Sequence, residues 1–171
     1  MQKILILNTG GTFSKEYNSV TGELKVYPCG AILEDIFEKT KLLDNADFEN
    51  IEFMNTIHKD SLDFTDTDRQ ELVDIINHYD YNKVIIIHGT DTMDKTAEFL
   101  DNAFMSKTIV LTGAMKPYEL EPVEATANLF LAYGALTQEM NYGVFIAMHG
   151  MIEDHTKLVK NRTVGIFRKV T

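Results

Sequence analysis

Short runs of aliphatic residues alternate along the chain with segments that have helical periodicity. Each run is bounded by glycine, asparagine, threonine or charged residues. Continuous apolar runs of this length are typical of strands buried on both faces, as in a parallel sheet. The five strands predicted in this way are Ile4–Leu7, Ile51–Met54, Val84–Ile87, Ile109–Leu111 and Val144–Met148.

Four segments between the predicted strands carry apolar residues on one helical face. The first helix follows a long polar stretch that runs from Asn8 to Gly30. The second is preceded by Thr67 and Gln70, which have the spacing of a capping box. The residues that mark the four helices are Ile32, Ile36 and Phe37; Leu72, Ile75, Ile76 and Tyr79; Ala97, Leu100 and Phe104; and Leu129, Ala132 and Leu136.

This alternation predicts a three-layer α/β/α fold with a mostly parallel, flavodoxin- or Rossmann-like sheet and right-handed crossovers. Because no repeat, linker or low-complexity tract divides residues 1–171, we expect a single domain. Ligands of open α/β sheets bind beyond the carboxyl ends of the strands. Three polar, glycine-containing segments follow predicted strands and should line one crevice there: Asn8–Thr12, His88–Thr92 and Thr112–Pro117.

Composition limits the kinds of partner. The 16 Lys and Arg residues against 26 Asp and Glu give the 171-residue chain a formal net charge of −10, which argues against a nucleic-acid partner. The apolar run Ile4–Leu7 is too short for a signal peptide or a membrane span. A lone cysteine, Cys29, cannot form an internal disulfide. We therefore expect a cytoplasmic protein without a membrane contact.

Threonine hydroxyls are the main candidates for chemistry. Thr12 follows paired glycines, which let a backbone approach a ligand closely, and its hydroxyl could act as a nucleophile if a base lies nearby. The same segment could instead be a plain turn. Thr90 and Asp91 lie at a strand end, where Asp91 could bind a substrate ammonium group, orient a base, or serve as the N-cap of the next helix.

Other classes of site have less support. The five histidines show no metal-ligand spacing on a predicted helix, so we expect no structural metal. Neither GxGxxG nor GxxxxGK[ST] is present, which disfavours a phosphate-binding loop. A serine hydrolase is also unsupported, because the sequence lacks a GxSxG elbow. Lys160 lies beyond the last predicted strand, and no pattern in the residues singles it out.

Several segments together resemble the bacterial-type L-asparaginase family. Thr9–Thr12 after the first strand and His88–Met93 after the third are similar to its two signatures. The resemblance continues through Gly113–Pro117 and Asn128 to Lys160, and covers the amino-terminal domain of the usual family architecture. It implies hydrolysis of L-asparagine to L-aspartate and ammonia without a cofactor or metal.

The resemblance also implies roles for individual residues. Thr12 would attack the side-chain amide and carry a β-aspartyl ester, and Asp91 would also bind the α-ammonium group of the substrate. Tyr27 is the alternative to Tyr17 as the family's loop tyrosine. The implied catalytic residues are Thr12, Tyr17, Thr90, Asp91 and Lys160, and the implied substrate-binding residues are Gly11, Ser61, Thr90 and Asp91.

The chain ends near the point where the family's smaller carboxy-terminal domain would begin. The resemblance is therefore to short, single-domain members, and it implies a homo-oligomer, a dimer or larger. A second hypothesis is an amino-acid-binding or regulatory domain with little or no turnover. The enzyme is favoured by the joint presence of Thr12, Thr90, Asp91 and Lys160, because a binding domain needs no nucleophile. Glutamine is expected to be the poorer substrate, with a minor activity.

Overall fold

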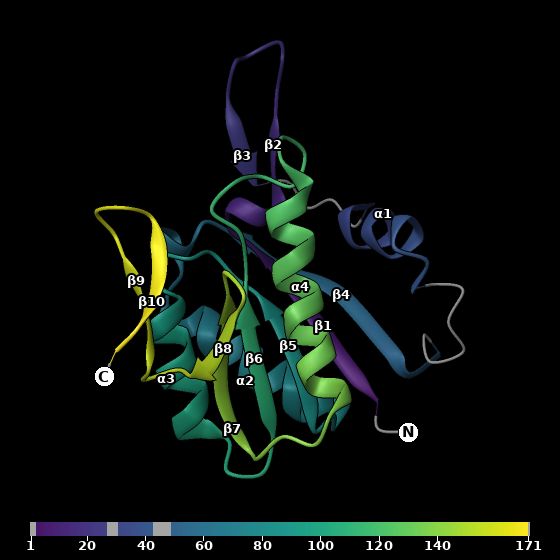
Figure 1. Cartoon of the computed structure of the whole chain (residues 1–171), viewed down its shortest axis with the longest axis vertical. Coiled ribbons are helices and arrows are strands. Elements are labelled where there is room, and N and C mark those ends of the chain that lie inside the picture. Colours follow the sequence, from purple (N-terminus) through teal and green to yellow (C-terminus); the bar gives the residue numbers. More distant parts are fainter. Residues whose placement is uncertain (1–2, 27–30, 43–48, 171) are drawn as a thin grey trace.

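A six-stranded sheet forms the centre of the fold (Figure 1). The computed structural model describes residues 3–26, 31–42 and 49–170. The strands lie in the order β4 (Ile51–Lys59), β1 (Ile4–Gly10), β5 (Lys83–Ile87), β6 (Thr108–Thr112), β7 (Gly143–Met148) and β8 (Met151–Asp154). All pairs are parallel except β7 with β8. The parallel strands thus have the 2-1-3-4-5 order of flavodoxin-like sheets, which confirms the predicted fold class.

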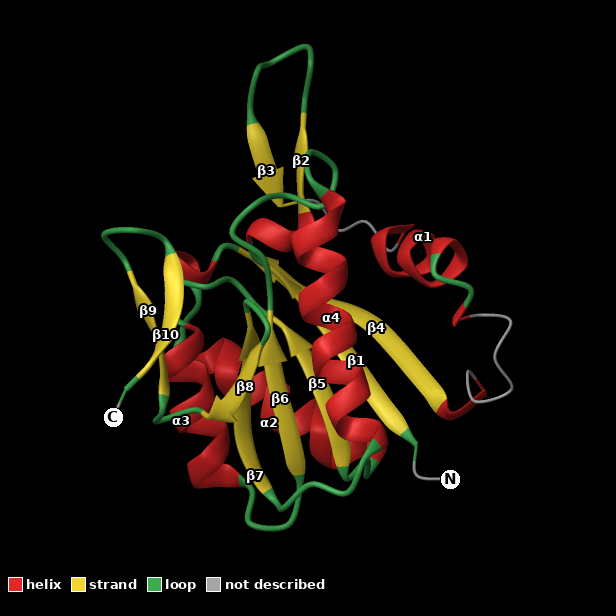
Figure 2. Cartoon of the chain, viewed as in Figure 1, coloured by secondary structure: helices red, strands yellow, loops and turns green. Residues whose placement is uncertain are grey.

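Helices cover both faces of this sheet (Figure 2). Helices α2 (Asp66–Tyr79) and α3 (Met93–Ala103) pack on one face, and α1 (Ala31–Lys39) and α4 (Pro122–Thr137) pack on the other. Successive strand residues point to opposite faces, so Ile86 contacts the first pair of helices while Ile85 contacts the second. Both side chains are fully buried, as expected for a continuous aliphatic run.

None of the helices in the described part of the chain is both long enough and apolar enough to cross a membrane.

The second helix begins earlier than the sequence spacing predicted. Thr65 is its N-cap: the Thr65 hydroxyl accepts a hydrogen bond from the backbone N–H of Asp68, and the Asp68 carboxylate accepts one from the N–H of Thr65. The predicted capping box at Thr67 and Gln70 is wrong, because both residues lie inside the helix. Asp68 also accepts a 2.7 Å hydrogen bond from Lys59, which joins this helix to the end of β4.

Two β-hairpins extend from the three layers, and neither was predicted. Strands β2 (Lys15–Tyr17) and β3 (Leu24–Val26) pair within the stretch expected to be a polar loop, and this hairpin stands away from the sheet (Figure 1). Strands β9 (Leu158–Asn161) and β10 (Ile166–Lys169) form the second hairpin, after β8. Strands of three or four residues with mixed side chains carry too little periodicity to be recognised from sequence.

Candidate active site

Three loops meet at the carboxyl ends of β1, β4 and β5. The N–H of Gly11 donates a 2.9 Å hydrogen bond to the carbonyl oxygen of Lys59. A Cβ atom on Gly11 would overlap the backbone of Gly89, and one on Gly89 would lie 2.6 Å from the Cβ of Ser61. Glycine at both positions therefore lets the loops touch backbone to backbone. The contact lies between β1 and β5, where the strand order reverses and ligands of such sheets bind.

Two glycines with a positive φ allow a test of this close approach. Gly11 has φ +69° and Gly22 has φ +72°, but no described atom lies within 4 Å of a Cβ built on Gly22. We expect Gly22→Ala to lower the free energy of unfolding by about 1–2 kcal/mol, from left-handed strain alone. Gly11→Ala should lower it by about 1–3 kcal/mol more, because of the overlap and because a ψ of −170° at this φ is essentially restricted to glycine. Equal losses in urea unfolding would contradict the backbone contact.

The second hairpin places a lysine against the loop that follows β5. Lys160 Nζ donates hydrogen bonds of 2.7 Å to both Thr90 Oγ1 and Asp91 Oδ1, and the lysine side chain is only 10% exposed. The buried Thr90 hydroxyl donates to Met115 Sδ at 3.4 Å. Arg162, from the same hairpin, donates to the carbonyl oxygen of Asp91 at 2.7 Å. As an ammonium group Lys160 can stabilise negative charge on the threonine oxygen, and once deprotonated it can accept the hydroxyl proton.

Asp91 is not the N-cap of α3. That helix begins at Met93 with Thr92 as its N-cap, and no side chain caps it. The predicted capping role of Asp91 is therefore wrong, and its carboxylate instead pairs with Lys160. The Asp91 side chain is 37% exposed, so it can also reach a cationic group of a ligand.

Ser61 connects the loop after β4 to the loop after β5. Its Oγ accepts a 3.2 Å hydrogen bond from the N–H of Asp91, and its carbonyl oxygen accepts a 2.6 Å bond from the Thr92 hydroxyl. Ser61 itself is buried. The predicted substrate-binding residues Gly11, Ser61 and Asp91 thus lie on loops in direct contact.

Thr12 begins a short 3₁₀ turn directly after Gly11. Two contacts hold the turn in place: Phe13 is buried in the core, and the Ser14 hydroxyl donates a 2.9 Å hydrogen bond to Asn8 Oδ1. Thr12 is partly exposed, and none of the described residues forms a hydrogen bond with its hydroxyl. Since Gly11 abuts Gly89, Thr12 and Thr90 follow two glycines that touch. The adjoining loops therefore carry the lysine-bound hydroxyl of Thr90 and the Thr12 hydroxyl, which no residue in the described part of the chain binds.

The loop tyrosine is not brought into this cluster. Tyr17 is 51% exposed on β2, and its backbone N–H donates a 2.6 Å hydrogen bond to the Glu119 carboxylate. Over the described ranges, no residue forms a hydrogen bond with the Tyr17 hydroxyl. Tyr27 lies outside the described residues. A tyrosine role stays a prediction.

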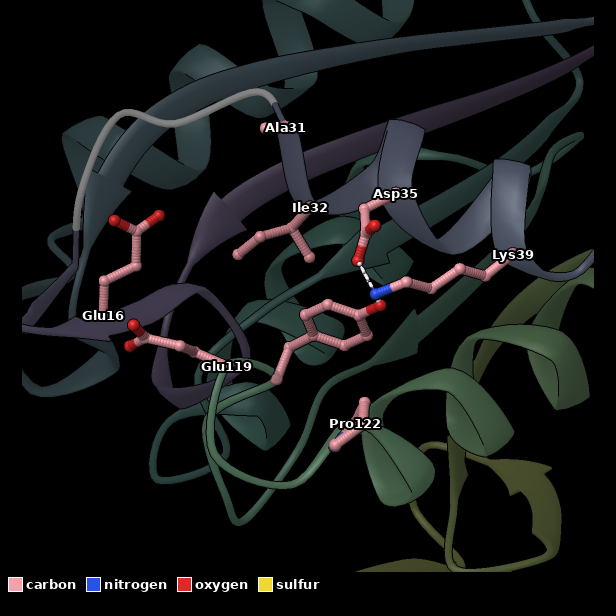
Figure 3. A pocket seen from close by; sticks show the side chains of 8 residues that line it. Glu16, Ala31, Ile32, Asp35, Lys39, Glu119 and Pro122 are labelled. Carbon is pink, nitrogen blue, oxygen red and sulfur yellow. Dashed lines mark hydrogen bonds and ion pairs between the residues drawn. The ribbon is translucent and has the colours of Figure 1, made fainter.

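A separate cavity of about 450 Å³ lies beside the β2–β3 hairpin, which contributes Glu16 to its lining (Figure 3). Asp35 accepts hydrogen bonds from Lys39 Nζ at 2.7 Å and from the Tyr118 hydroxyl at 2.6 Å, so polar groups of the cavity pair with one another. Its lining residues are Glu16, Ala31, Ile32, Asp35, Lys39, Tyr118, Glu119 and Pro122, and they include none of the predicted site residues.

The described residues contain no group of three or more His, Cys, Asp or Glu side chains placed to hold a metal ion.

His88 is a buried residue of the site that sequence reasoning did not assign. Its Nδ1–H donates to the carbonyl oxygen of Gly89 at 2.7 Å, so Nε2 accepts a 3.0 Å hydrogen bond from the Thr96 hydroxyl. The Thr96 oxygen in turn accepts a hydrogen bond from Arg69 Nε. Burial lowers the pKa of His88 to about 4, and the positive charge of Arg69 contributes to the lowering. A histidine directly after an aliphatic strand was the available signal for such a buried role.

The lowered pKa of His88 predicts how the free energy of unfolding depends on pH. Between about pH 6.5 and pH 4 the unfolded chain binds a proton at His88 that the folded protein does not, so the unfolded state gains stability as pH falls. The His88 contribution to the free energy of unfolding should therefore fall by up to about 1.4 kcal/mol per pH unit over this window. Urea unfolding of His88→Gln should lack this slope, whereas the exposed His78→Gln should retain it. Identical slopes in wild type and His88→Gln would contradict the buried neutral ring.

Comparison with known proteins identifies the family. The family model described as Asparaginase, N-terminal matches residues 3–167, nearly the whole chain. The chain belongs to the asparaginase family. This membership confirms the resemblance that the two threonine-containing motifs indicated.

Individual relatives of this asparaginase-family chain differ in name. L-asparaginase 2 of Escherichia coli K12 is 30% identical over 173 residues, 97% of this chain and 48% of that protein. A component of the glutamyl-tRNA(Gln) amidotransferase of Methanococcus vannielii is 30% identical over 155 residues, 90% of this chain and 36% of that protein. The crystal structure of "Probable Cytoplasmic L-asparaginase" from Campylobacter jejuni matches with a TM-score of 0.80 and 26% identity, over 99% of this chain and 53% of that one. The chain thus spans about half or less of these relatives.

Proposed function

We propose that the protein hydrolyses the side-chain amide of L-asparagine, giving L-aspartate and ammonia, with Thr12 as the nucleophile. The observation that carries this proposal is Lys160, which donates to both Thr90 and Asp91 on the loop beside that of Thr12, in a chain of the asparaginase family. A lysine with a largely covered side chain against a threonine hydroxyl is the kind of pair that proton transfer requires.

The proposed reaction has two steps. Thr12 Oγ1 bonds to the amide carbon, the hydroxyl proton passes to the nitrogen, the C–N bond breaks, and ammonia leaves a β-aspartyl ester on Thr12. Water then adds to the ester carbon, one water proton returns to Thr12 Oγ1, and L-aspartate leaves. Thr90 and Lys160 would move protons in both steps, and backbone N–H groups near Gly11 would stabilise the oxyanion.

Substrate recognition would use the charges on the crevice wall. The Asp91 carboxylate would bind the α-ammonium group, and Ser61 with the loop amides would bind the α-carboxylate. Relatives include a glutaminase-asparaginase of Acinetobacter glutaminasificans, 29% identical over 160 residues. We propose asparagine as the better substrate and glutamine as a minor one, since one methylene is worth only about 1–3 kcal/mol.

Assembly and location belong to the same proposal. We propose a homo-oligomer, a dimer or larger, that acts on this small molecule in the cytoplasm, and not on nucleic acid or a membrane. The word cytoplasmic in the name of the Campylobacter jejuni structure supports the location.

One observation favours a second candidate, a domain that binds an amino acid without turnover. Within the described residues no base contacts the Thr12 hydroxyl, although a nucleophile needs one.

Ammonia release and calorimetric binding, both measured with purified protein, separate the two candidates. The hydrolase proposal predicts ammonia release that depends on L-asparagine and is slower with L-glutamine. Binding of L-asparagine without ammonia release would favour the binding domain. If the protein neither binds L-asparagine nor releases ammonia, both candidates are excluded.

A further inference from the structure

Glu124 binds the loop that contacts Thr90 of the Thr90–Lys160 pair. This residue lies in the first turn of α4, and its carboxylate accepts hydrogen bonds from two consecutive backbone N–H groups of the loop after β6, at 2.9 Å from Met115 and 3.2 Å from the next residue. Met115 Sδ in turn accepts the hydrogen bond of the Thr90 hydroxyl. The carboxylate thus fixes the loop on which that hydroxyl rests.

His149 lies in the tight turn between β7 and β8 and contacts the hairpin that carries Lys160. Its Nδ1 lies 3.3 Å from the backbone N–H of Phe167, which donates to it, and the two rings meet edge to face with centroids 5.9 Å apart. Phe167 pairs directly with Lys160 across the β9–β10 hairpin. The ring therefore contacts the strand residue opposite the lysine.

The hydrogen bonds of the ring define its tautomer. Because Phe167 N–H donates to Nδ1, a neutral His149 carries its proton on Nε2, which lies 3.0 Å from Glu124 Oε1. The Glu124 carboxylate accepts a hydrogen bond from Nε2–H, which keeps the proton on Nε2 and leaves Nδ1 as an acceptor. Hydrogen bonds through Glu124 and His149 thus connect the Met115 loop to β10. The Thr90–Lys160 hydrogen bond connects the same loop region to β9.

We infer that His149 is a positioning residue that sets Lys160 Nζ against the Thr90 hydroxyl, with Glu124 fixing the tautomer that this requires. The inference rests on the proposed function, because it concerns the same reaction. Without the Phe167 bond, the hairpin can shift relative to the Met115 loop. A displacement of about 1 Å in a catalytic group can lower turnover by about 10²-fold.

Two substitutions separate the two bonds of the ring. In His149→Asn, Oδ1 can replace Nδ1 as the acceptor for Phe167, and asparagine tolerates the backbone φ of 53°. In His149→Gln, the longer amide can still donate to Glu124 but leaves the Phe167 N–H without its partner. Circular dichroism and thermal melting establish that both variants are folded.

The first readout does not depend on activity. Reductive methylation of lysines, quantified by mass spectrometry, should label Lys160 faster in His149→Gln than in wild type, and at the wild-type rate in His149→Asn. The exposed Lys157 is the internal control and should label equally in all three proteins. Unchanged labelling of Lys160 in His149→Gln would overturn the inference.

The second readout is ammonia release from L-asparagine. His149→Gln should lower kcat by about 10- to 100-fold with KM changed less than about twofold, and His149→Asn should restore kcat. Normal kcat in His149→Gln, beside an active wild type, would also overturn the inference. An inactive wild type with the expected labelling pattern would overturn the proposed function and support the placement of Lys160 by His149.

Discussion

Thr12→Ala should abolish ammonia release from L-asparagine, with kcat lower by about 10³-fold or more. An alanine side chain has no oxygen to bond to the amide carbon, so no ester can form at this position. The proposed contacts of Asp91 and Ser61 with the substrate are untouched. We therefore expect binding of L-asparagine, measured by calorimetry, to change little while turnover disappears.

The fold should tolerate this substitution. The Thr12 hydroxyl has no hydrogen-bond partner among the residues described, so its removal leaves no buried group unsatisfied. Thr12→Ser is the matched control, because it keeps a hydroxyl and should keep measurable turnover. A Thr12→Ala protein that releases ammonia at the wild-type rate would contradict the mechanism.

Lys160→Met should lower kcat for L-asparagine by about 10²- to 10⁴-fold, the usual contribution of a positioned acid or base. Methionine keeps much of the unbranched stem but can neither donate to Thr90 and Asp91 nor accept a proton. The two 2.7 Å hydrogen bonds of Nζ are both lost. Steady-state ammonia release, with folding checked by circular dichroism, measures the effect.

Lys157→Met provides the control for Lys160→Met. Lys157 lies just before β9 on the same segment, but its side chain is exposed, so its loss should leave kcat unchanged. Equal losses of activity in the two variants would assign the effect to general changes in charge. No loss in either would remove Lys160 from the mechanism.

The sheet could be predicted because its strands have one unambiguous pattern. Residues such as Ile85 and Ile86 are both aliphatic although they face opposite helix layers, and only a strand covered on both sides requires this. The start of α2 could not be predicted in the same way. Thr65 and Thr67 each precede a polar residue at capping-box spacing, and only the backbone geometry selects Thr65.

In the candidate site, too, the strand pattern could place some residues and not others. Gly11 and Gly89 follow aliphatic strands, so their place at the carboxyl edge of the sheet followed from the pattern. Lys160 lies 70 positions from Thr90 in the sequence, and its contact depends on a short hairpin without clear periodicity. Its predicted role came from the family resemblance and not from the residues themselves. The placement of His149 beside Phe167 had no signal in the sequence.

The most direct test of the central claim is mass spectrometry of the protein quenched in acid during turnover of L-asparagine. We predict a covalent aspartyl adduct, attached by an ester bond to the peptide that contains Thr12 and absent from Thr12→Ala. Ammonia release without any adduct at Thr12, or an adduct on Thr90 in its place, would contradict the account.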